Sequence, residues 1–208
     1  MQKSVRIITD SRTARVLVDP MRREIVRLLA EDERTENELA EDMGLSNPSV
    51  GHHLKVLRHA GLIRVARTEA EEHGILQKFY ASNAVVYLVD SHSMSKEIDR
   101  YFMPISLERV RGIMAAAGLV VGSATELTEA DVENFAKLFV AALVEASKRF
   151  SKSWKGTREE LLAALYTAAL RYVLKDAETP AKVRELLQRA LLKKTHNPHN
   201  PSQRRSRV

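Results

Sequence analysis

The spacing of hydrophobic positions predicts helices over most of the first sixty residues. Residues 12–18 and 21–30 both fit a helical repeat. Asp19 and Pro20 supply a capping side chain and a first-turn proline where the second of these helices begins. The hydrophobic face of this second helix carries Ile25, Leu28 and Leu29.

A short helix and a longer one follow. The short helix begins at Thr35 or Asn37 and ends at Gly44. Ser46 is a favourable N-cap for the longer helix, which runs to about residue 59 before Gly61 stops it. Because a tight turn joins these two helices, the pattern predicts a helix-turn-helix.

Residues with high β propensity come directly after the helix-turn-helix. Segments 62–68 and 75–82 are predicted strands, and residues 69–74 join them with Gly74 near the tip. The predicted order is therefore helices followed by a hairpin, which is the order of a winged helix.

The second half of the chain has a purely helical pattern. Residues 91–105, with several serines and Pro104, are interpreted as a linker or connecting helix. Helices are predicted over 106–118, from Thr128 to about residue 150, from Thr157 onward, and after the Thr179-Pro180 pair. Glutamate or aspartate three residues after Thr128 and Thr157 is typical of capping boxes.

This pattern predicts a mainly α fold with a small β-hairpin wing. Residues 1–90 are expected to form a winged helix-turn-helix DNA-binding domain, and residues 106–193 a helical dimerisation or effector domain. Residues 194–208 are too polar and proline-rich to order themselves, so a disordered basic tail is expected there.

Composition then narrows the class of protein. The 208 residues are 44% hydrophobic and 29% charged, which is typical of a globular domain. The sequence has neither a signal peptide nor an apolar run long enough to cross a bilayer, so we expect a cytoplasmic protein without membrane contact. The absence of cysteine excludes disulfides, thiolate metal sites and cysteine nucleophiles.

Charge is distributed unevenly along the chain. The formal net charge is +6, yet residues 1–90 hold 13 basic and 14 acidic side chains, whereas residues 91–208 hold 20 and 13. Seven of the acids fall between Glu31 and Asp42, and residues 43–68 contain no acid. The helix at 46–60 therefore lies in an acid-free basic segment, which favours a polyanionic partner.

The two faces of that helix differ in chemistry. Val50, Leu54 and Leu57 share one face, while His52, Lys55 and His59 lie opposite, flanked by Ser49 and Arg58. A polar face without acids fits the acceptor-rich major groove of DNA, and the alternative is an ordinary solvated face. On the hairpin, Arg64, Arg67 and Lys78 are placed to contact flanking phosphates.

These residues carry a family resemblance. The segments LVDPMRREIVRLL (17–29), LA (39–40), LS (45–46) and VGHHLKVLRHAGLI (50–63) resemble the winged helix-turn-helix of ArsR-type transcription regulators. VRIITD (5–10), RT (67–68) and KFY (78–80) are similar to an archaeal branch of uncharacterised regulators with a helical carboxyl-terminal half. The resemblance implies a homodimer on near-palindromic DNA, with recognition-helix contacts at Asn47, Ser49, His52, His53 and Lys55.

The metal-sensing part of that resemblance does not transfer. Asp90, His92, Glu97 and Asp99 have no second spaced histidine, so we expect no metal there and no cofactor. His52 and His53 point about 100° apart on a helix and cannot chelate one ion. His53 is either a DNA contact or a half-buried packing residue.

The aromatic residues of the second half leave two interpretations open. Core or dimer-interface packing is the first, and a cavity for an apolar effector is the second. These residues are Phe135, Phe139, Trp154, Tyr166 and Tyr172.

The sequence thus predicts a dimeric, sequence-specific regulator of transcription bound to double-stranded DNA. Asn47, Ser49 and His52 would read bases, and the phosphate contacts would be Lys55, Arg58, Arg64, Arg67 and Lys78. The alternative is a winged-helix module that binds protein or RNA within the transcription machinery. No nucleophile motif or glycine-rich phosphate loop stands out, so we do not expect an enzyme.

Overall fold

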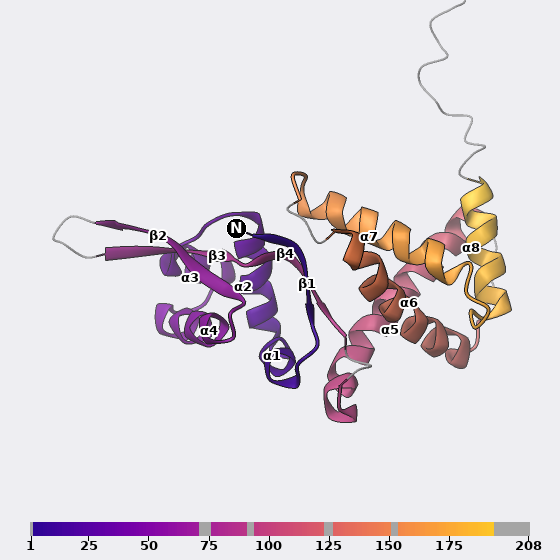
Figure 1. Cartoon of the computed structure of the whole chain (residues 1–208), viewed down its shortest axis with the longest axis horizontal. Helices are drawn as coiled ribbons and strands as arrows, with labels where there is room; N and C mark the ends of the chain where they lie inside the picture. The colour runs from indigo at the N-terminus through magenta and orange to yellow at the C-terminus, as the bar shows by residue number, and fades with distance from the viewer. Residues whose placement is uncertain (1, 71–75, 91–93, 123–126, 151–153, 194–208) are drawn as a thin grey trace, which may run out of the picture.

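A computed structural model of the chain describes residues 2–70, 76–90, 94–122, 127–150 and 154–193. Figure 1 shows two lobes side by side along the long axis of the molecule. The fold is mainly helical, with a winged helix-turn-helix in the first lobe and helices alone in the second, as predicted. None of the described helices is long and apolar enough to span a membrane.

The first three helices begin where capping chemistry predicts. They are α1 (Ser11–Val16), α2 (Pro20–Glu31) and α3 (Glu36–Met43). The Asp19 carboxylate accepts hydrogen bonds from the first backbone N–H groups of α2. Thr35, not Asn37, caps α3, because Thr35 and Glu38 form a reciprocal capping box. Gly44 ends α3 with a left-handed φ of 62°.

Helix α4 (Asn47–His59) is the second helix of the helix-turn-helix. Ser46 stands at its N-cap position, although the Ser46 side chain makes no capping hydrogen bond. Gly61, with φ of 64°, turns the chain into the wing. Val50, Leu54 and Leu57 are buried, so the predicted apolar face of the helix packs on the core of the lobe.

The wing is an antiparallel hairpin of β2 (Ile63–Ala70) and β3 (Leu76–Ser82), with a register shift between Val65 and Arg67. The predicted tip at Gly74 lies outside the described residues. A second strand pair was not predicted: β1 (Lys3–Ile8) pairs in parallel with β4 (Ala84–Val89). This pairing joins segments about eighty residues apart, so no local signal reveals it.

The second lobe contains α5 (Lys96–Val121), α6 (Glu129–Ser147), a 3-10 turn (Lys148–Phe150), α7 (Arg158–Val173) and α8 (Ala181–Lys193). Both predicted capping boxes, at Thr128 and Thr157, are present. Helix α5 begins ten residues earlier than the predicted helix at 106 and continues through Pro104. Ile98 and Phe102, in the first turns of α5, are buried in the core of the first lobe. Their burial offsets the loss of the backbone hydrogen bond that Pro104 cannot donate.

Two hydrophobic cores fill the lobes and share elements. Ile98 and Phe102 of α5 belong to the core of the first lobe, whereas the later turns of that helix, from Val110 on, pack in the second. Conversely, Val5 of β1 and Val86 of β4 belong to the core of the second lobe. The two lobes are therefore joined by packing as well as by the chain. Phe135 and Phe139 are fully buried in the second core.

Candidate nucleic-acid interface

The polar face of α4 is open to solvent. His52, Lys55 and His59 are exposed, and they lie opposite the buried Val50 and Leu54. In Figure 1, α4 lies well away from α6, α7 and α8, although the hairpin of β2 and β3 extends farther still. The carboxyl-terminal helices therefore do not cover this face.

The amino end of α4 is bound to α3. The Asn47 side-chain amide donates to the Asn37 side-chain oxygen at 2.8 Å, and Ser49 is half-buried nearby in sequence. The Glu36 carboxylate also approaches α4, because a Cβ built on Gly51 would lie 2.6 Å from its Oε1 atom. Although α4 itself contains no acid, one carboxylate of α3 therefore lies against it.

His53 points inward, not to solvent. Its side chain is 14% exposed, and its Nδ1 atom lies 3.8 Å from the Asp19 carboxylate at the start of α2. That nitrogen is buried and has no hydrogen-bond partner among the described residues. The position corresponds to the packing alternative for His53. His59 is exposed, and its Nδ1 atom lies 2.7 Å from the Lys55 carbonyl oxygen.

The basic side chains of the wing have different surroundings. Arg64 is half-buried and donates to the Ser82 carbonyl oxygen at 2.8 Å. Arg67 lies over the Phe79 ring, with 3.4 Å between its guanidinium carbon and the ring centroid. It also pairs with Glu33 at 3.0 Å and with Glu69. Two carboxylates therefore share the charge of Arg67.

The remaining two predicted phosphate contacts are exposed. Lys78 of β3 and Arg58, in the last turn of α4, have no ion-pair partner among the described residues. The structure thus leaves four predicted residues exposed on α4, namely Asn47, His52, Lys55 and Arg58. It half-buries Ser49, His53 and Arg64, and it pairs Arg67 with acids.

Hydrogen bonds that sequence reasoning missed fix the junction between α4 and the wing. The Gly61 carbonyl oxygen accepts from Arg6 at 2.5 Å and from the Asn83 amide at 2.9 Å. The Tyr87 hydroxyl donates to the Leu62 carbonyl oxygen at 2.5 Å. Burial raises the pKa of Tyr87, so this hydroxyl keeps its proton. The β1–β4 pair therefore holds the end of α4.

In the described part of the chain, no group of three or more His, Asp or Glu side chains lies close enough together to hold a metal ion. Glu97 pairs instead with Arg15 at 2.8 Å, and His92 lies outside the described residues.

Two comparisons with known proteins found a match, and the family match falls on this interface. Residues 19–65 match the family profile described as "Bacterial regulatory protein, arsR family". A segment of 49 residues is 39% identical to "Transcriptional repressor SdpR" of Bacillus subtilis (strain 168). That alignment covers 24% of this chain and 54% of the relative, so the chain matches about half the length of that protein. The profile match runs from the cap of α2 into β2 and includes the entire helix-turn-helix.

Proposed function

Because residues 19–65 carry an ArsR-type helix-turn-helix, we propose that the protein is a cytoplasmic DNA-binding regulator of transcription that acts as a homodimer. Residues 1–90 bind the DNA, the segment 91–105 connects the two domains, and the helices over 106–193 form the dimer. The observation that carries the proposal is the polar face of α4, which is uncovered and contains no acid. An electropositive, hydrogen-bonding helix of this kind suits the major groove.

Within this proposal the residues have distinct roles. Asn47, Ser49 and His52 face the base edges, because they lie along the first two turns of α4, where a recognition helix meets the groove. His53 does not contact the DNA in this arrangement. It packs toward the start of α2, where its Nδ1 atom lies near the Asp19 carboxylate, and so supports the position of α4. The sequence-independent phosphate contacts are Lys55, Arg58, Arg64, Arg67 and Lys78.

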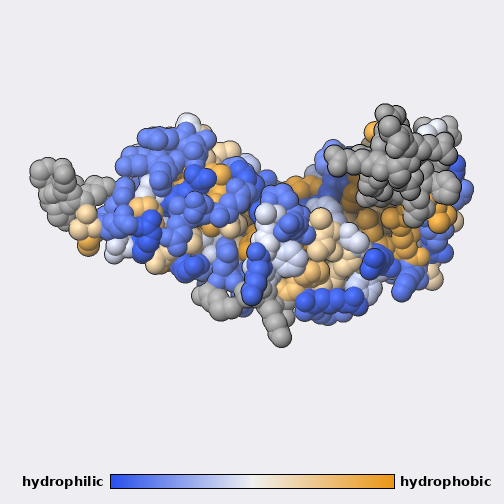
Figure 2. Space-filling view, turned by 90° about the horizontal axis from the view of Figure 1, so that it is seen from above, coloured by the Kyte–Doolittle hydropathy of each residue, from blue (hydrophilic) through white to orange (hydrophobic). Residues whose placement is uncertain are grey.

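The dimer is supported by hydrophobic surface on the second lobe. Leu119 in the last turns of α5 is 84% exposed, and Leu192 on α8 is 70% exposed, with Val120 and Leu191 also exposed beside them in sequence. On the face seen in Figure 2, hydrophobic residues gather on this lobe, whereas the visible surface of the first lobe is mostly hydrophilic. A second copy that covers these residues would bring two α4 helices into one assembly, and an operator contacted by both requires them to lie roughly 34 Å apart.

Selection of duplexes from a random DNA library with the purified protein tests the function. We expect enrichment of a near-palindromic sequence. If about six to eight phosphates are neutralised per dimer, log K should fall against log salt with a slope of roughly −5 to −7. A flat salt dependence, or no enrichment, would contradict the proposal.

Two substitutions then separate base contacts from phosphate contacts. His52→Ala should reduce the preference for the selected duplex over a scrambled one by about tenfold. Lys55→Ala should weaken binding to both duplexes equally and lower the salt slope by about one. The matched control is Lys96→Ala, which replaces an exposed lysine in the first turn of α5. It should change neither the duplex preference nor the salt slope. Unchanged DNA affinity in both α4 variants would favour a protein or RNA partner.

Sedimentation equilibrium tests the dimer. Leu119→Glu and Leu192→Glu place a charge on the proposed interface and should shift the protein toward monomer. Leu76→Glu, an exposed leucine of the wing, is the control and should remain dimeric. A wild-type protein that stays monomeric at micromolar concentration would exclude the dimer.

A further inference from the structure

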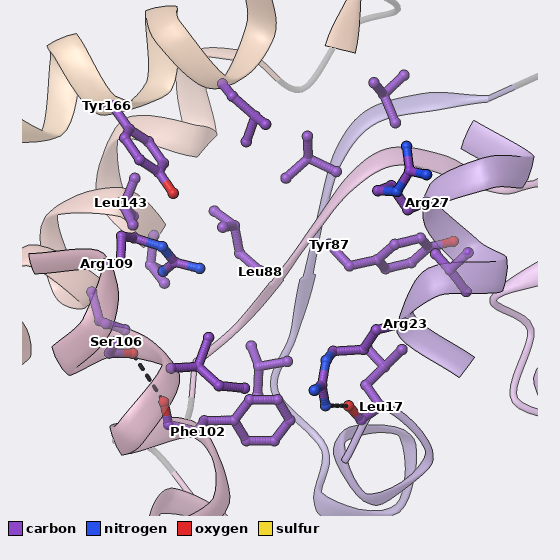
Figure 3. A pocket seen from close by; sticks show the side chains of 18 of the residues that line it. Leu17, Arg23, Arg27, Tyr87, Leu88, Phe102, Ser106, Arg109, Leu143 and Tyr166 are labelled. Atoms are coloured by element: carbon purple, nitrogen blue, oxygen red, sulfur yellow. Dashed lines mark hydrogen bonds between the residues drawn. The ribbon is translucent and has the colours of Figure 1, made fainter. Parts of the chain in front are cut away.

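A cavity of about 270 Å³ lies between the two lobes. Its walls come from α2 and β4 on one side and from α5, α6 and α7 on the other (Figure 3). The volume lies just below the range of roughly 300–1,000 Å³ in which sites for drug-sized molecules fall, so the cavity suits a smaller ligand. The cavity is therefore large enough for a small ligand and is built by both lobes.

Most of the wall is hydrophobic, but its charged residues are of one sign. Val85, Leu88, Phe102, Leu143 and Leu162 are among the apolar residues that line it. Four arginines line it as well, whereas no aspartate, glutamate or lysine of the described residues does. An apolar chamber with only positive charges favours an amphipathic anion.

Two of these arginines, both on α2, are already bound to the protein. Arg23 donates to the carbonyl oxygens of Leu17 and Val18 at 2.9 and 2.7 Å. Arg27 pairs with Glu24 and Glu31, each at 2.7 Å. Their donors are largely used, so they contribute positive charge and a fixed wall but few free hydrogen bonds.

The other two arginines have donors left over. Arg109 of α5 makes no ion pair within the described parts of the chain, and its guanidinium lies 5.8 Å from the Tyr166 ring centroid. Figure 3 shows the Arg109 side chain extending into the cavity from the side opposite Arg27. Arg158, the first residue of α7, has a buried Nε atom without a hydrogen-bond partner among those residues.

The carboxylates near Arg158 leave room for another anion. Glu159 approaches it only to 3.9 Å. The pKa of Glu24 is lowered mainly by its hydrogen bonds from Arg27, and the charge of Arg158 lowers it further. Glu24 is thus already bound to Arg27, and its interaction with Arg158 is a longer-range electrostatic attraction. A buried guanidinium N–H without a partner is unfavourable, and a ligand oxygen would satisfy it.

We propose that this cavity binds a small carboxylate with an apolar body. Arg109 is the principal partner of the carboxylate, because guanidinium and carboxylate groups match in geometry and charge. Arg158 adds positive charge and its unused donor. The apolar body packs against Leu88, Leu143 and Leu162, which removes its surface from water.

Occupation of the cavity would reach the DNA-binding lobe. The wall includes Tyr87, whose hydroxyl holds the Leu62 carbonyl at the end of α4, and it includes residues of α2. A ligand that fixes these elements against the second lobe would change the DNA affinity. This consequence rests on the proposed function, whereas the binding itself does not.

Isothermal titration calorimetry on the full chain without DNA tests the site. Octanoate and 2-naphthoate are the probes, and 1-octanol is the neutral control for octanoate. We expect one carboxylate to bind per chain, and octanol to bind at least about tenfold more weakly, because its neutral hydroxyl cannot form an ion pair with an arginine. Equal affinity for octanoate and octanol, or no binding of either carboxylate at millimolar concentration, would overturn the proposal.

Variants locate the binding. Arg109→Gln and Arg158→Gln remove the charge and shorten the side chain but keep it polar, and each should weaken octanoate binding severalfold while octanol is unaffected. Arg100→Gln, an exposed arginine on the same helix α5, is the matched control. If an arginine variant fails to fold, Val144→Phe, which fills the cavity from α6, decides. Octanoate affinity unchanged by Val144→Phe would place the binding elsewhere and refute the site.

Discussion

At the scale of single residues, the wing shows how neighbours control the charge that a basic side chain can offer. Arg67 shares its charge with Glu33 and Glu69, whereas Lys78 has no acidic partner among the described residues. A phosphate that pairs with Arg67 must compete with the Glu33 carboxylate. Arg67 should therefore contribute less to DNA binding than its exposure indicates.

Removal of Glu33 tests this competition. Glu33→Gln should raise the affinity for duplex DNA about two- to fivefold at low salt, because an exposed ion pair is worth up to about 1 kcal/mol. The salt slope should become steeper as Arg67 engages a phosphate. Fluorescence anisotropy at several salt concentrations measures both quantities. Glu41→Gln, an exposed acid of α3, is the control, and an equal gain in that variant would show a general charge effect.

The cap of α2 is a second residue-scale feature. Asp19→Ala removes the side chain that accepts from the Met21 and Arg22 N–H groups, and it should lower the free energy of unfolding by about 1 kcal/mol. Urea denaturation at neutral pH measures this difference. Glu41→Ala should leave stability nearly unchanged, and a similar loss in that control would contradict a capping role.

The same cap makes part of the stability depend on pH. Burial acts to raise the pKa of Asp19, but hydrogen bonds from Arg22 and Met21 outweigh it, so this pKa lies below its usual value. The stabilisation is therefore present above the unfolded-state pKa of about 4, and it is lost as pH falls through the lower folded-state pKa. The difference in unfolding free energy between wild type and Asp19→Asn should shrink between pH 6 and pH 3. A constant difference would argue against the charged cap.

At the scale of elements, two glycines of the helix-turn-helix have opposite requirements. Gly44 ends α3 in the left-handed region, and a Cβ there would meet nothing within 4 Å. Its requirement is thus purely conformational. Gly51 lies inside α4 with ordinary helical backbone, where glycine weakens a helix, and a Cβ there would displace only the flexible end of Glu36.

Alanine at these positions should therefore act in opposite directions. Gly44→Ala should destabilise the protein by about 1 kcal/mol, because L-residues are strained in the left-handed region. Gly51→Ala should stabilise it by roughly 0.5–1 kcal/mol once the Glu36 carboxylate moves aside. Thermal denaturation of both variants gives the comparison, and each serves as the control for the other. If both substitutions changed the stability in the same direction, the opposite requirements inferred for Gly44 and Gly51 would be wrong.

At the scale of the whole molecule, the two cores share structural elements and should not unfold independently. Helix α5 places Ile98 in the first core and Val110 in the second. The β1–β4 pair likewise contributes Ile8 to the first core and Val5 to the second. Loss of either core would therefore expose hydrophobic surface of the other.

Calorimetry of a core variant tests this coupling. Ile98→Ala should lower the free energy of unfolding by about 2–5 kcal/mol and shift a single transition to lower temperature. Tyr101→Ala, on the exposed face of the same helix and away from the proposed dimer interface, should change stability little. Two separate transitions, of which Ile98→Ala moves only one, would show that the lobes unfold independently.

The sequence by itself determined the local structure and the class of fold. Capping boxes at Thr35, Thr128 and Thr157, and the glycine that ends α3, depend on residues within one helical turn of each other. Helical repeats and β-rich segments are equally local, so the winged helix-turn-helix and the helical second half could be predicted. The DNA contacts proposed for α4 and the wing are still predictions.

Only the tertiary structure decided which side chains meet across the chain. The Glu33–Arg67 pair joins residues that are 34 positions apart in the sequence. His53 and Asp19, which also lie close together, are separated by the same number of positions. The β1–β4 pairing likewise joins segments about eighty residues apart, and the arginine-lined cavity depends on segments from both lobes. Periodicity reports which face of an element is apolar, but the element against which that face packs is set by the closure of the whole chain.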